Sequence, residues 1–308
     1  MKHIGRPSFE LSVLLLALLA NSCATQQAGR LTLPAETSMS AKAGRGDLIS
    51  VTLNLEGGEG LLFLVDTGAP FILLDKSLEP KLGKPLGSTK AHSTYGTTRD
   101  RFYKAPRLYL GNTELVTGER IMTMDFIRLA GDLNRMTEAK GRLMGIIGMD
   151  CLKNYCIQLD FSAGKMRFLD PDYMGSEDLG RAFPLTISAN RAFVEENLLG
   201  VKGVRSQIDT GCNFDGVTTP KLFQRWNTSP RTEAGEIRFP NGVFTGGRYT
   251  NVVLHGDRPN LIGLGFLGRH LVTLNFPKRT MYLKQTSVGP RALVAPSLEK
   301  ERTESSGR

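Results

Sequence analysis

Hydrophobic and polar residues alternate over short stretches along most of the chain, and this period of two is typical of β-strands. Residues 48–55 (LISVTLNL) mostly alternate, a glycine-rich turn follows, and the apolar run 61–65 is too short for a helix. The same order returns in the second half, with expected strands at 191–199 and 204–208 on either side of a turn. Each pattern predicts a hairpin whose second strand is buried.

The two hairpins belong to a longer internal repeat. Residues 64–69 (LVDTGA) recur as 207–212 (QIDTGC), and 146–148 (IIG) recur as 261–263 (LIG). From Ile147 and Ile262, the isoleucines directly before the two glycines, the halves align without a gap for about 22 residues. The aspartate and the later glycine are 82 residues apart in the first half and 54 in the second. The first half therefore carries about 28 extra residues, which we place at 112–142.

This repeat predicts an all-β protein with two similar lobes related by a pseudo-twofold axis and few short helices. We expect the helices near 75–82, after each Ile-Gly element and at 221–226. The predicted parts are a signal peptide at 1–22, a linker at 23–44, an N-terminal lobe at 45–172, a linker at 173–179, a C-terminal lobe at 180–287 and a disordered tail at 288–308.

The composition is that of a soluble globular protein. Of the 308 residues, 40% are hydrophobic and 22% charged, with only 4 cysteines, which excludes a disordered, collagenous or disulfide-stapled chain. The formal net charge is +9, but the excess of Lys and Arg is spread along the chain and is not interleaved with aromatic residues. We therefore expect no nucleic-acid partner.

The N-terminus has the pattern of an export signal. Lys2, His3 and Arg6 form a basic segment, and the apolar run at 11–20 (LSVLLLALLA) follows it. Ten helical residues would extend about 15 Å, which is too short to cross a bilayer. A cleaved signal peptide therefore fits better than a membrane anchor.

Residues 20–23 (ANSC) resemble the cleavage site of a bacterial lipoprotein signal. In that family the cysteine, here Cys23, is lipidated and becomes the mature N-terminus, and a residue other than Asp after it, here Ala24, favours the outer membrane. The resemblance implies a periplasmic or outer-membrane lipoprotein that is held at the membrane by its lipid. The alternative is simple secretion with Cys23 incidental.

Export would place the other cysteines in an oxidising compartment. Cys151 and Cys156 are five residues apart. The sequence allows two alternatives for them, a disulfide or two buried free thiols. Cys212 has no obvious partner.

The duplicated Asp-Thr-Gly tripeptide contains the candidate catalytic residues. A single copy is weak evidence because its ordinary role is a turn, but here each copy follows an apolar strand and precedes an Ile-Gly element. A pseudo-twofold axis would bring Asp66 and Asp209 together, and two carboxylates in contact share one proton. One of them would then act as a base on water while the other donates a proton to a carbonyl.

The neighbours of the two aspartates suit this arrangement. Gly68 and Gly211 allow each loop to turn tightly and to approach the other. Thr67 and Thr210 can form hydrogen bonds across the junction of the lobes and hold the loops together.

With these residues the chain resembles an aspartic protease, specifically a bacterial member with two tandem retropepsin-like lobes. The resemblance covers about residues 45–285, with both lobes in one chain as in pepsin. It implies two acid-protease β-barrel lobes, a psi-loop crossing, an aspartic endopeptidase activity on a peptide or protein substrate, and a monomer. No cofactor is implied, because the carboxylates themselves activate the water.

The family also has a flap, which is a hairpin that closes over the substrate. Residues 93–97 (STYGT) are similar to the pepsin flap, so Tyr95 and Gly96 are the candidate flap residues. The alternative is an ordinary hairpin tip. In the second half, we expect the equivalent tip near 241–242, without an aromatic residue there.

The chain departs from the family after each Asp-Thr-Gly. Pepsin-like enzymes have Ser or Thr at this position, donating to the aspartate, whereas this chain has Ala69 and Cys212. Loss of a donor to the charged form raises the pKa of a carboxyl group, so we expect a pH optimum above the strongly acidic range. For the extra segment 112–142, the alternatives are a cover for the cleft and a surface excursion with its own small core.

Other reaction classes lack support. There is no His-Glu-x-x-His, Gly-x-Ser-x-Gly or Gly-x-Gly-x-x-Gly motif, and no metal site is expected. The competing hypothesis from another class is a non-catalytic envelope lipoprotein that uses the acid-protease fold as a peptide-binding module. A third is an enzyme that processes one partner protein.

Overall fold

The structure is a computed structural model that describes residues 31–56, 58, 60–93, 96–126, 141–172, 178–196, 202–219, 221, 235–256 and 260–290. The chain divides into two compact units, Met1–Thr32 and Leu33–Arg308, and the described strands and helices lie in the second. This unit is mostly β, with two large sheets and few short helices, which confirms the predicted fold class.

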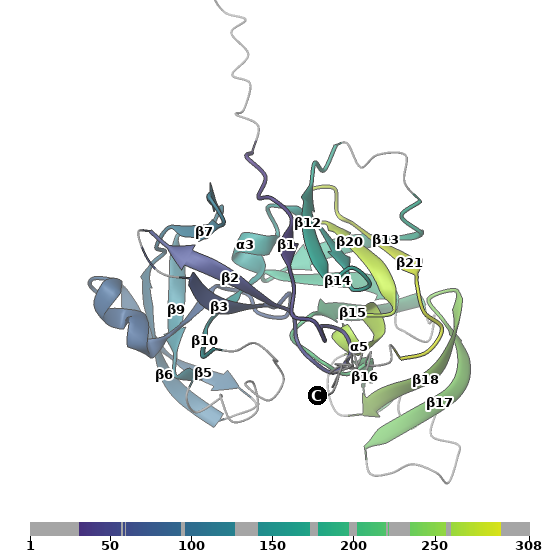
Figure 1. The fold of residues 1–308 in the computed structure, drawn as a ribbon. Coiled ribbons are helices and arrows are strands. Elements are labelled where there is room, and N and C mark those ends of the chain that lie inside the picture. Colours follow the sequence, from purple (N-terminus) through teal and green to yellow (C-terminus); the bar gives the residue numbers. More distant parts are fainter. Residues whose placement is uncertain are drawn as a thin grey trace, which may run out of the picture. The chain divides into compact units, whose positions relative to one another are not determined.

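The first sheet is built from the N-terminal half (Figure 1). Its strands are β2 (Ser50–Leu55), β3 (Gly60–Val65), β4 (Leu73–Asp75), β5 (Gly87–Ser93), β6 (Gly96–Lys104), β7 (Leu108–Leu110), β8 (Thr113–Glu114), β9 (Arg120–Met124) and β10 (Leu143–Ile147). Within the described residues they lie in the order β5-β6-β9-β4-β10-β3-β2-β7-β8.

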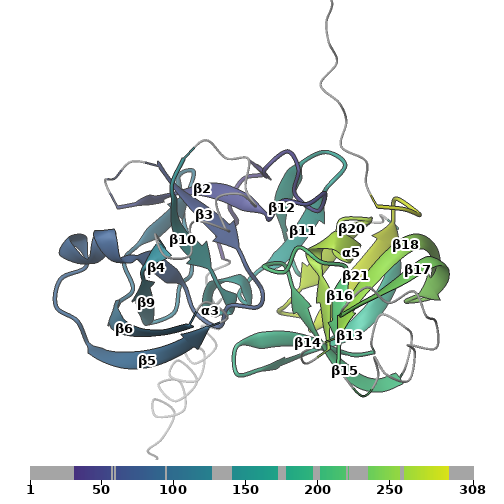
Figure 2. The same ribbon diagram turned by 90° about the horizontal axis from the view of Figure 1, so that it is seen from below.

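The second sheet contains the C-terminal half and three strands from earlier in the chain. Its strands are β1 (Thr37–Ser38), β11 (Cys156–Asp160), β12 (Lys165–Leu169), β13 (Arg181–Ser188), β14 (Arg191–Glu196), β15 (Lys202–Asp209), β16 (Gly216–Thr218), β17 (Glu236–Phe244), β18 (Gly247–Gly256), β19 (Leu261–Gly263), β20 (His270–Asn275) and β21 (Thr280–Gln285). Within the described residues the order is β1-β12-β11-β20-β21-β13-β14-β15-β19-β16-β18-β17. Because β11 and β12 pair into this sheet (Figure 2), the predicted lobe boundary after residue 172 does not separate the two sheets.

The register of β11 on β20 locates the pseudo-twofold axis. The repeat makes Gln158 equivalent to Thr273, since equivalent residues in this part of the alignment are 115 apart. These two residues lie directly opposite each other in the antiparallel pair, and the Gln158 side-chain amide donates to the Thr273 hydroxyl oxygen at 3.2 Å. A residue opposite its own equivalent lies on the axis, so the pseudo-twofold symmetry predicted from the repeat passes through this buried pair.

The alternation predicted from the sequence produces the hairpins. In β2, Val51 and Leu53 are buried while Thr52 between them is exposed, and β2 pairs antiparallel with β3. In the second half, β14 pairs with β15 in the same way. Buried apolar side chains from both halves form one continuous core.

The described helices are short and lie where the sequence predicts them. The 3-10 helix η1 (Lys76–Lys81) begins after Asp75, whose carboxylate accepts from the backbone N–H of Ser77. The α-helices α3 (Met149–Leu152) and α5 (Leu264–Leu267) follow the two Ile-Gly elements. Of the segment expected to be helical at 221–226, only Lys221 lies within the described residues. No helix in the described ranges is long and apolar enough to cross a membrane.

The hairpin of the second half has its tip four residues later than expected. Asn241 pairs with Thr250 and Gly242 with Tyr249, so both are inside the strands, and the tip is formed by Thr245 and Gly246. These two tip residues have φ angles of 49° and 84°. Positive φ at both central residues is typical of a type I′ turn, a common two-residue hairpin connection. The expectation of a tip at 241–242 was therefore wrong.

The extra segment of the first half belongs partly to the main sheet. Strand β9 lies in it and pairs with both β4 and β6, and Met124 and Phe126 are buried in the main core. The alternative of a surface excursion with its own small core is therefore wrong for this part of the segment, and residues 127–140 lie outside the described residues.

No disulfide joins the described cysteines. Cys151 on α3 and Cys156 on β11 are buried, and Cys212 is partly buried. Burial raises the pKa of the Cys156 thiol to about 12. The buried-thiol alternative therefore holds in this structure.

Asp150 of α3 generates a prediction about stability. Its side chain is 5% exposed, and burial raises its pKa to about 6, above the ordinary 3.8. The folded state then holds the proton more tightly than the unfolded state, so the free energy of unfolding should fall by up to about 3 kcal/mol as the pH rises from about 4 to above 6. Because Asp150→Asn removes this titration, the stability of the variant relative to wild type should increase over the same window, measured by urea unfolding. The exposed Asp178→Asn is the control; an equal and pH-independent effect of both variants would contradict the prediction.

Candidate active site

The two Asp-Thr-Gly loops are held by equivalent backbone contacts. Asp66 follows β3 and Asp209 ends β15, and each strand has a parallel neighbour, β10 or β19, from the Ile-Gly element. Beyond these strands, the backbone N–H of Met149 donates to the carbonyl of Ala69 at 2.8 Å. The equivalent bond from Leu264 to the carbonyl of Cys212 is 2.7 Å long. The Ile-Gly elements therefore fix the course of the loops.

Glycine is required in these elements because the loop backbone lies against them. A Cβ atom on Gly148 would lie 2.2 Å from the carbonyl oxygen of Phe71. On Gly263 it would lie 2.1 Å from that of Phe214. Real Cβ contacts are never this short, so a side chain at either position would push the loop out of place.

Reciprocal hydrogen bonds join the two loops. The backbone N–H of Thr67 donates to Thr210 Oγ1 at 3.0 Å, and that of Thr210 donates to Thr67 Oγ1 at 3.1 Å. Each hydroxyl then donates to the opposite strand, that of Thr67 to the carbonyl of Ile208 at 2.8 Å and that of Thr210 to the carbonyl of Val65 at 2.7 Å. Both threonines are buried. The structure thus contains the hydrogen bonds across the loops that the sequence predicts for this pair.

The two aspartates lie in contact with the opposite loop. A Cβ atom on Gly68 would lie 2.6 Å from the carboxyl group of Asp209, and one on Gly211 would lie 2.4 Å from that of Asp66. The carboxyl groups also form a hydrogen bond with each other. The structure therefore brings together the six residues predicted from the repeat, and the two glycines leave the space that the carboxyl groups occupy.

Hydrogen bonds make the two carboxyl groups unequal. Asp66 Oδ1 accepts from the backbone N–H groups of Gly68 at 2.7 Å and Ala69 at 3.2 Å. Asp209 Oδ1 accepts from Gly211 at 3.0 Å. Backbone N–H donors stabilise a carboxylate, so Asp66 is the better place for a negative charge.

The pKa directions agree with this assignment. Burial raises the pKa of Asp66, and the N–H groups of Gly68 and Ala69 oppose that rise. Burial and then the charge of Asp66 raise the pKa of Asp209. In the singly charged pair, Asp66 therefore carries the charge and Asp209 the proton, although the titration belongs to the pair.

Two aromatic residues lie in the loops after the aspartates and were not identified from the sequence. Phe71 and Phe214 each lie five positions after an aspartate, so they are equivalent in the repeat. Phe71 packs edge-on against Phe102 with ring centres 6.4 Å apart. Phe214 is 46% exposed and lies against the ring of His255 with centres 4.0 Å apart. Aligning the two repeats beyond the fourth residue after Asp would have identified them.

Arg191 is a second residue that the sequence analysis missed. It is the first residue of β14, and its Nε donates to the carbonyl oxygen of Gly68 at 3.3 Å. Its charge lowers the pKa of Asp209, although less than burial and Asp66 raise it. Nothing in the local sequence indicates this role, because the contact joins segments 123 residues apart.

Some predicted site residues cannot be placed. Tyr95 and Cys23 lie outside the described residues. Gly96 begins β6 and pairs with Ser93 of β5, so two residues connect the strands of the candidate flap hairpin. In the described part of the chain, no group of three or more His, Cys, Asp or Glu side chains forms a candidate metal site.

The threonine hydrogen bonds generate a prediction. Thr67→Val removes a hydroxyl that accepts one buried N–H and donates to one buried carbonyl, so it should lower the free energy of unfolding by about 2 to 5 kcal/mol. Thr210→Val should cost a similar amount. Both substitutions remove parts of the same set of hydrogen bonds. The loss of unfolding free energy in the double variant should therefore be at least about 1 kcal/mol smaller than the sum of the two single losses, measured by urea unfolding. Thr52→Val on the exposed face of β2 is the control, with an expected change within about 0.5 kcal/mol. Strictly additive effects would contradict the prediction.

Comparison with known proteins supports the fold. No family model matches the sequence, and no curated protein matches it. Solved structures with a similar fold include the crystal structure of basic 7S globulin from soybean, with a TM-score of 0.50 and 12% sequence identity. The match covers 83% of this chain and 96% of the globulin chain. At this identity the likeness concerns the fold alone: the chain has a two-lobed, pepsin-like β fold.

Proposed function

We propose that the protein is an aspartic endopeptidase with Asp66 and Asp209 as its catalytic pair. The observation that carries the proposal is the contact between two carboxyl groups that share a hydrogen bond and lie in loops joined by Thr67 and Thr210. Burying two carboxyl groups in contact raises their proton affinity, and an arrangement that unfavourable is typical of a functional site.

The unequal carboxyl groups assign the chemical steps. The Asp66 carboxylate takes a proton from a water molecule, whose oxygen forms a bond to the carbon of the scissile carbonyl. Asp209 gives its proton to the carbonyl oxygen at the same time, which yields a neutral tetrahedral intermediate. The charge of the pair is unchanged, with the proton now on Asp66.

The second step releases the products. Asp66 donates its proton to the amide nitrogen, the carbon–nitrogen bond breaks, and Asp209 recovers a proton from one hydroxyl of the intermediate. The products are a carboxylic acid and an amine, and the pair returns to its starting form. No cofactor takes part in these steps.

We also propose that the enzyme is exported and held at a membrane by a lipid on Cys23. The support is the sequence of residues 1–23. Wild-type protein made in a bacterium should sediment with membranes, and Cys23→Ser should appear in the soluble fraction, because it lacks the acyl chains that bind the bilayer. Equal membrane retention of both forms would refute the lipid anchor.

The catalytic pair is tested by removing each carboxylate. Asp66→Asn and Asp209→Asn should each reduce kcat/KM on a mixed peptide library by at least about a thousandfold, because one carboxyl group cannot act as both acid and base. The wild-type profile should peak between mildly acidic and neutral pH, because burial raises the pKa values of the pair and Ala69 and Cys212 supply no hydroxyl donor.

The control is Asp178→Asn, which removes an exposed carboxylate and should retain wild-type cleavage. A profile that peaks below about pH 3 would contradict the pH expectation. If neither Asp66→Asn nor Asp209→Asn changes cleavage, and pepstatin-like transition-state mimics do not bind, the enzyme proposal fails. Peptide binding without any cleavage would favour a non-catalytic peptide-binding module.

A further inference from the structure

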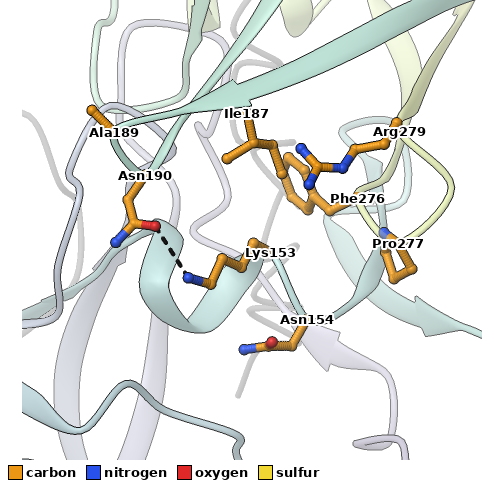
Figure 3. A pocket seen from close by; sticks show the side chains of 8 residues that line it. All are labelled: Lys153, Asn154, Ile187, Ala189, Asn190, Phe276, Pro277 and Arg279. Atoms are coloured by element: carbon orange, nitrogen blue, oxygen red, sulfur yellow. Dashed lines mark hydrogen bonds between the residues drawn. The ribbon is translucent and has the colours of Figure 1, made fainter.

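Arg191 contacts the loop of Asp66 from a hairpin that Lys153 also holds in place. Strands β13 and β14 are joined by Ala189 and Asn190, with φ angles of 49° and 51°, which form a tight two-residue turn. The side-chain oxygen of Asn190 accepts from Lys153 Nζ, just after α3, at 3.1 Å (Figure 3). Nε of Arg191 donates to the carbonyl of Gly68. Both contacts join the hairpin to the first half of the repeat and hold the guanidinium at the loop of Asp66, where its charge lowers the pKa of Asp209.

The equivalent position in the first half is not occupied by a cation. Leu64 and Gln207 are equivalent in the repeat. In the sheets, Ser50 lies opposite Leu64 and Phe193 lies opposite Gln207, so Ser50 and Phe193 are equivalent as well. Counting two residues back from Ser50 and Phe193 makes Leu48 the equivalent of Arg191, and Leu48 is a buried apolar side chain. The symmetry of the fold therefore does not require an arginine here, and the charge is a feature of one side.

In the described ranges, the charge of Arg191 has no partner that explains it. Among the described residues Arg191 forms no ion pair with a carboxylate outside the aspartate pair, and its described hydrogen bond uses Nε, which leaves the terminal amino groups as donors. A cation here also opposes the proton on Asp209, which the proposed reaction needs. A negative group of the substrate that pairs with the guanidinium would cancel this effect.

We propose that Arg191 is a specificity residue that binds an acidic side chain of the substrate next to the scissile bond. This inference rests on the proposed endopeptidase function and defines its substrates as acidic peptides. Arginine suits the role because its planar terminal amino groups can form two parallel hydrogen bonds with one carboxylate. The net charge of +9 would favour the approach of such substrates.

The test uses pairs of peptides that differ only by Glu or Gln at positions flanking the scissile bond. Wild type should cleave the Glu member of at least one pair with a kcat/KM at least about tenfold higher, because a charge-assisted hydrogen bond is lost in the Gln member. Arg191→Gln should abolish the preference, and Arg191→Glu should reverse it in favour of Lys at that position. Arg205→Gln, which removes an exposed cation on neighbouring β15, should keep the preference.

A bracing role alone would give a different result. If Arg191 only held the hairpin to Gly68, Arg191→Gln would slow the Glu and Gln peptides equally, and this outcome would overturn the proposal. A second readout is the pH profile on a Gln peptide: removing the cation raises the pKa of Asp209, so the alkaline limb of kcat/KM should move to higher pH.

Failure of the endopeptidase proposal can be separated from failure of this one. Analogues of the same peptide pairs with a reduced scissile bond cannot be cleaved, and their binding is measured by calorimetry on wild type and Arg191→Gln. If no peptide is cleaved but wild type binds the Glu analogue at least about tenfold more tightly, the acidic specificity holds without the enzyme. If peptides are cleaved but neither assay shows a Glu preference, the inference about Arg191 is wrong and the endopeptidase remains.

Discussion

Two carboxyl groups held in contact within a protein cannot both be ionised, and the structure around Asp66 and Asp209 is organised by this constraint. The glycines of the two loops leave room for the opposite carboxyl group, with no space for a Cβ atom. The hydroxyl and N–H groups of Thr67 and Thr210 bond reciprocally across the axis, so neither loop can move away without leaving buried polar groups unpaired. The two loops are thus held together by neutral hydrogen bonds.

This junction depends on a second contact between the repeats. Strand β11 of the first half pairs with β20 of the second over five residues, with Gln158 facing Thr273 on the pseudo-twofold axis. The loops with the aspartates and these strands are linked through the Ile-Gly elements and the helices α3 and α5. The axis that relates the aspartates is therefore set by a continuous sheet as well as by the loops.

The repeat alone predicted the parts of the site that occur twice: both aspartates, their threonines and glycines, the hairpins and the short helices. Each of these follows from a local pattern with a local cause. The pairing of β11 with β20 and the position of β9 between β4 and β6 depend on contacts between distant segments, which periodicity does not contain. The tip at Thr245 and Gly246 was missed because Asn-Gly is the stronger local turn signal, and the register of the long strands overrode it.

The asymmetry of the site could not come from the repeat, because it arises where the copies differ. A perfect twofold pair would give both aspartates the same proton affinity, yet the proposed hydrolysis needs one base and one acid. Here Asp66 accepts from two N–H groups of its own loop, whereas Asp209 accepts from Gly211 and faces the charge of Asp66. Arg191 breaks the symmetry a second time, since its equivalent Leu48 is apolar. Duplication therefore explains how two carboxyl groups meet, and divergence of the surrounding residues determines which of them holds the proton.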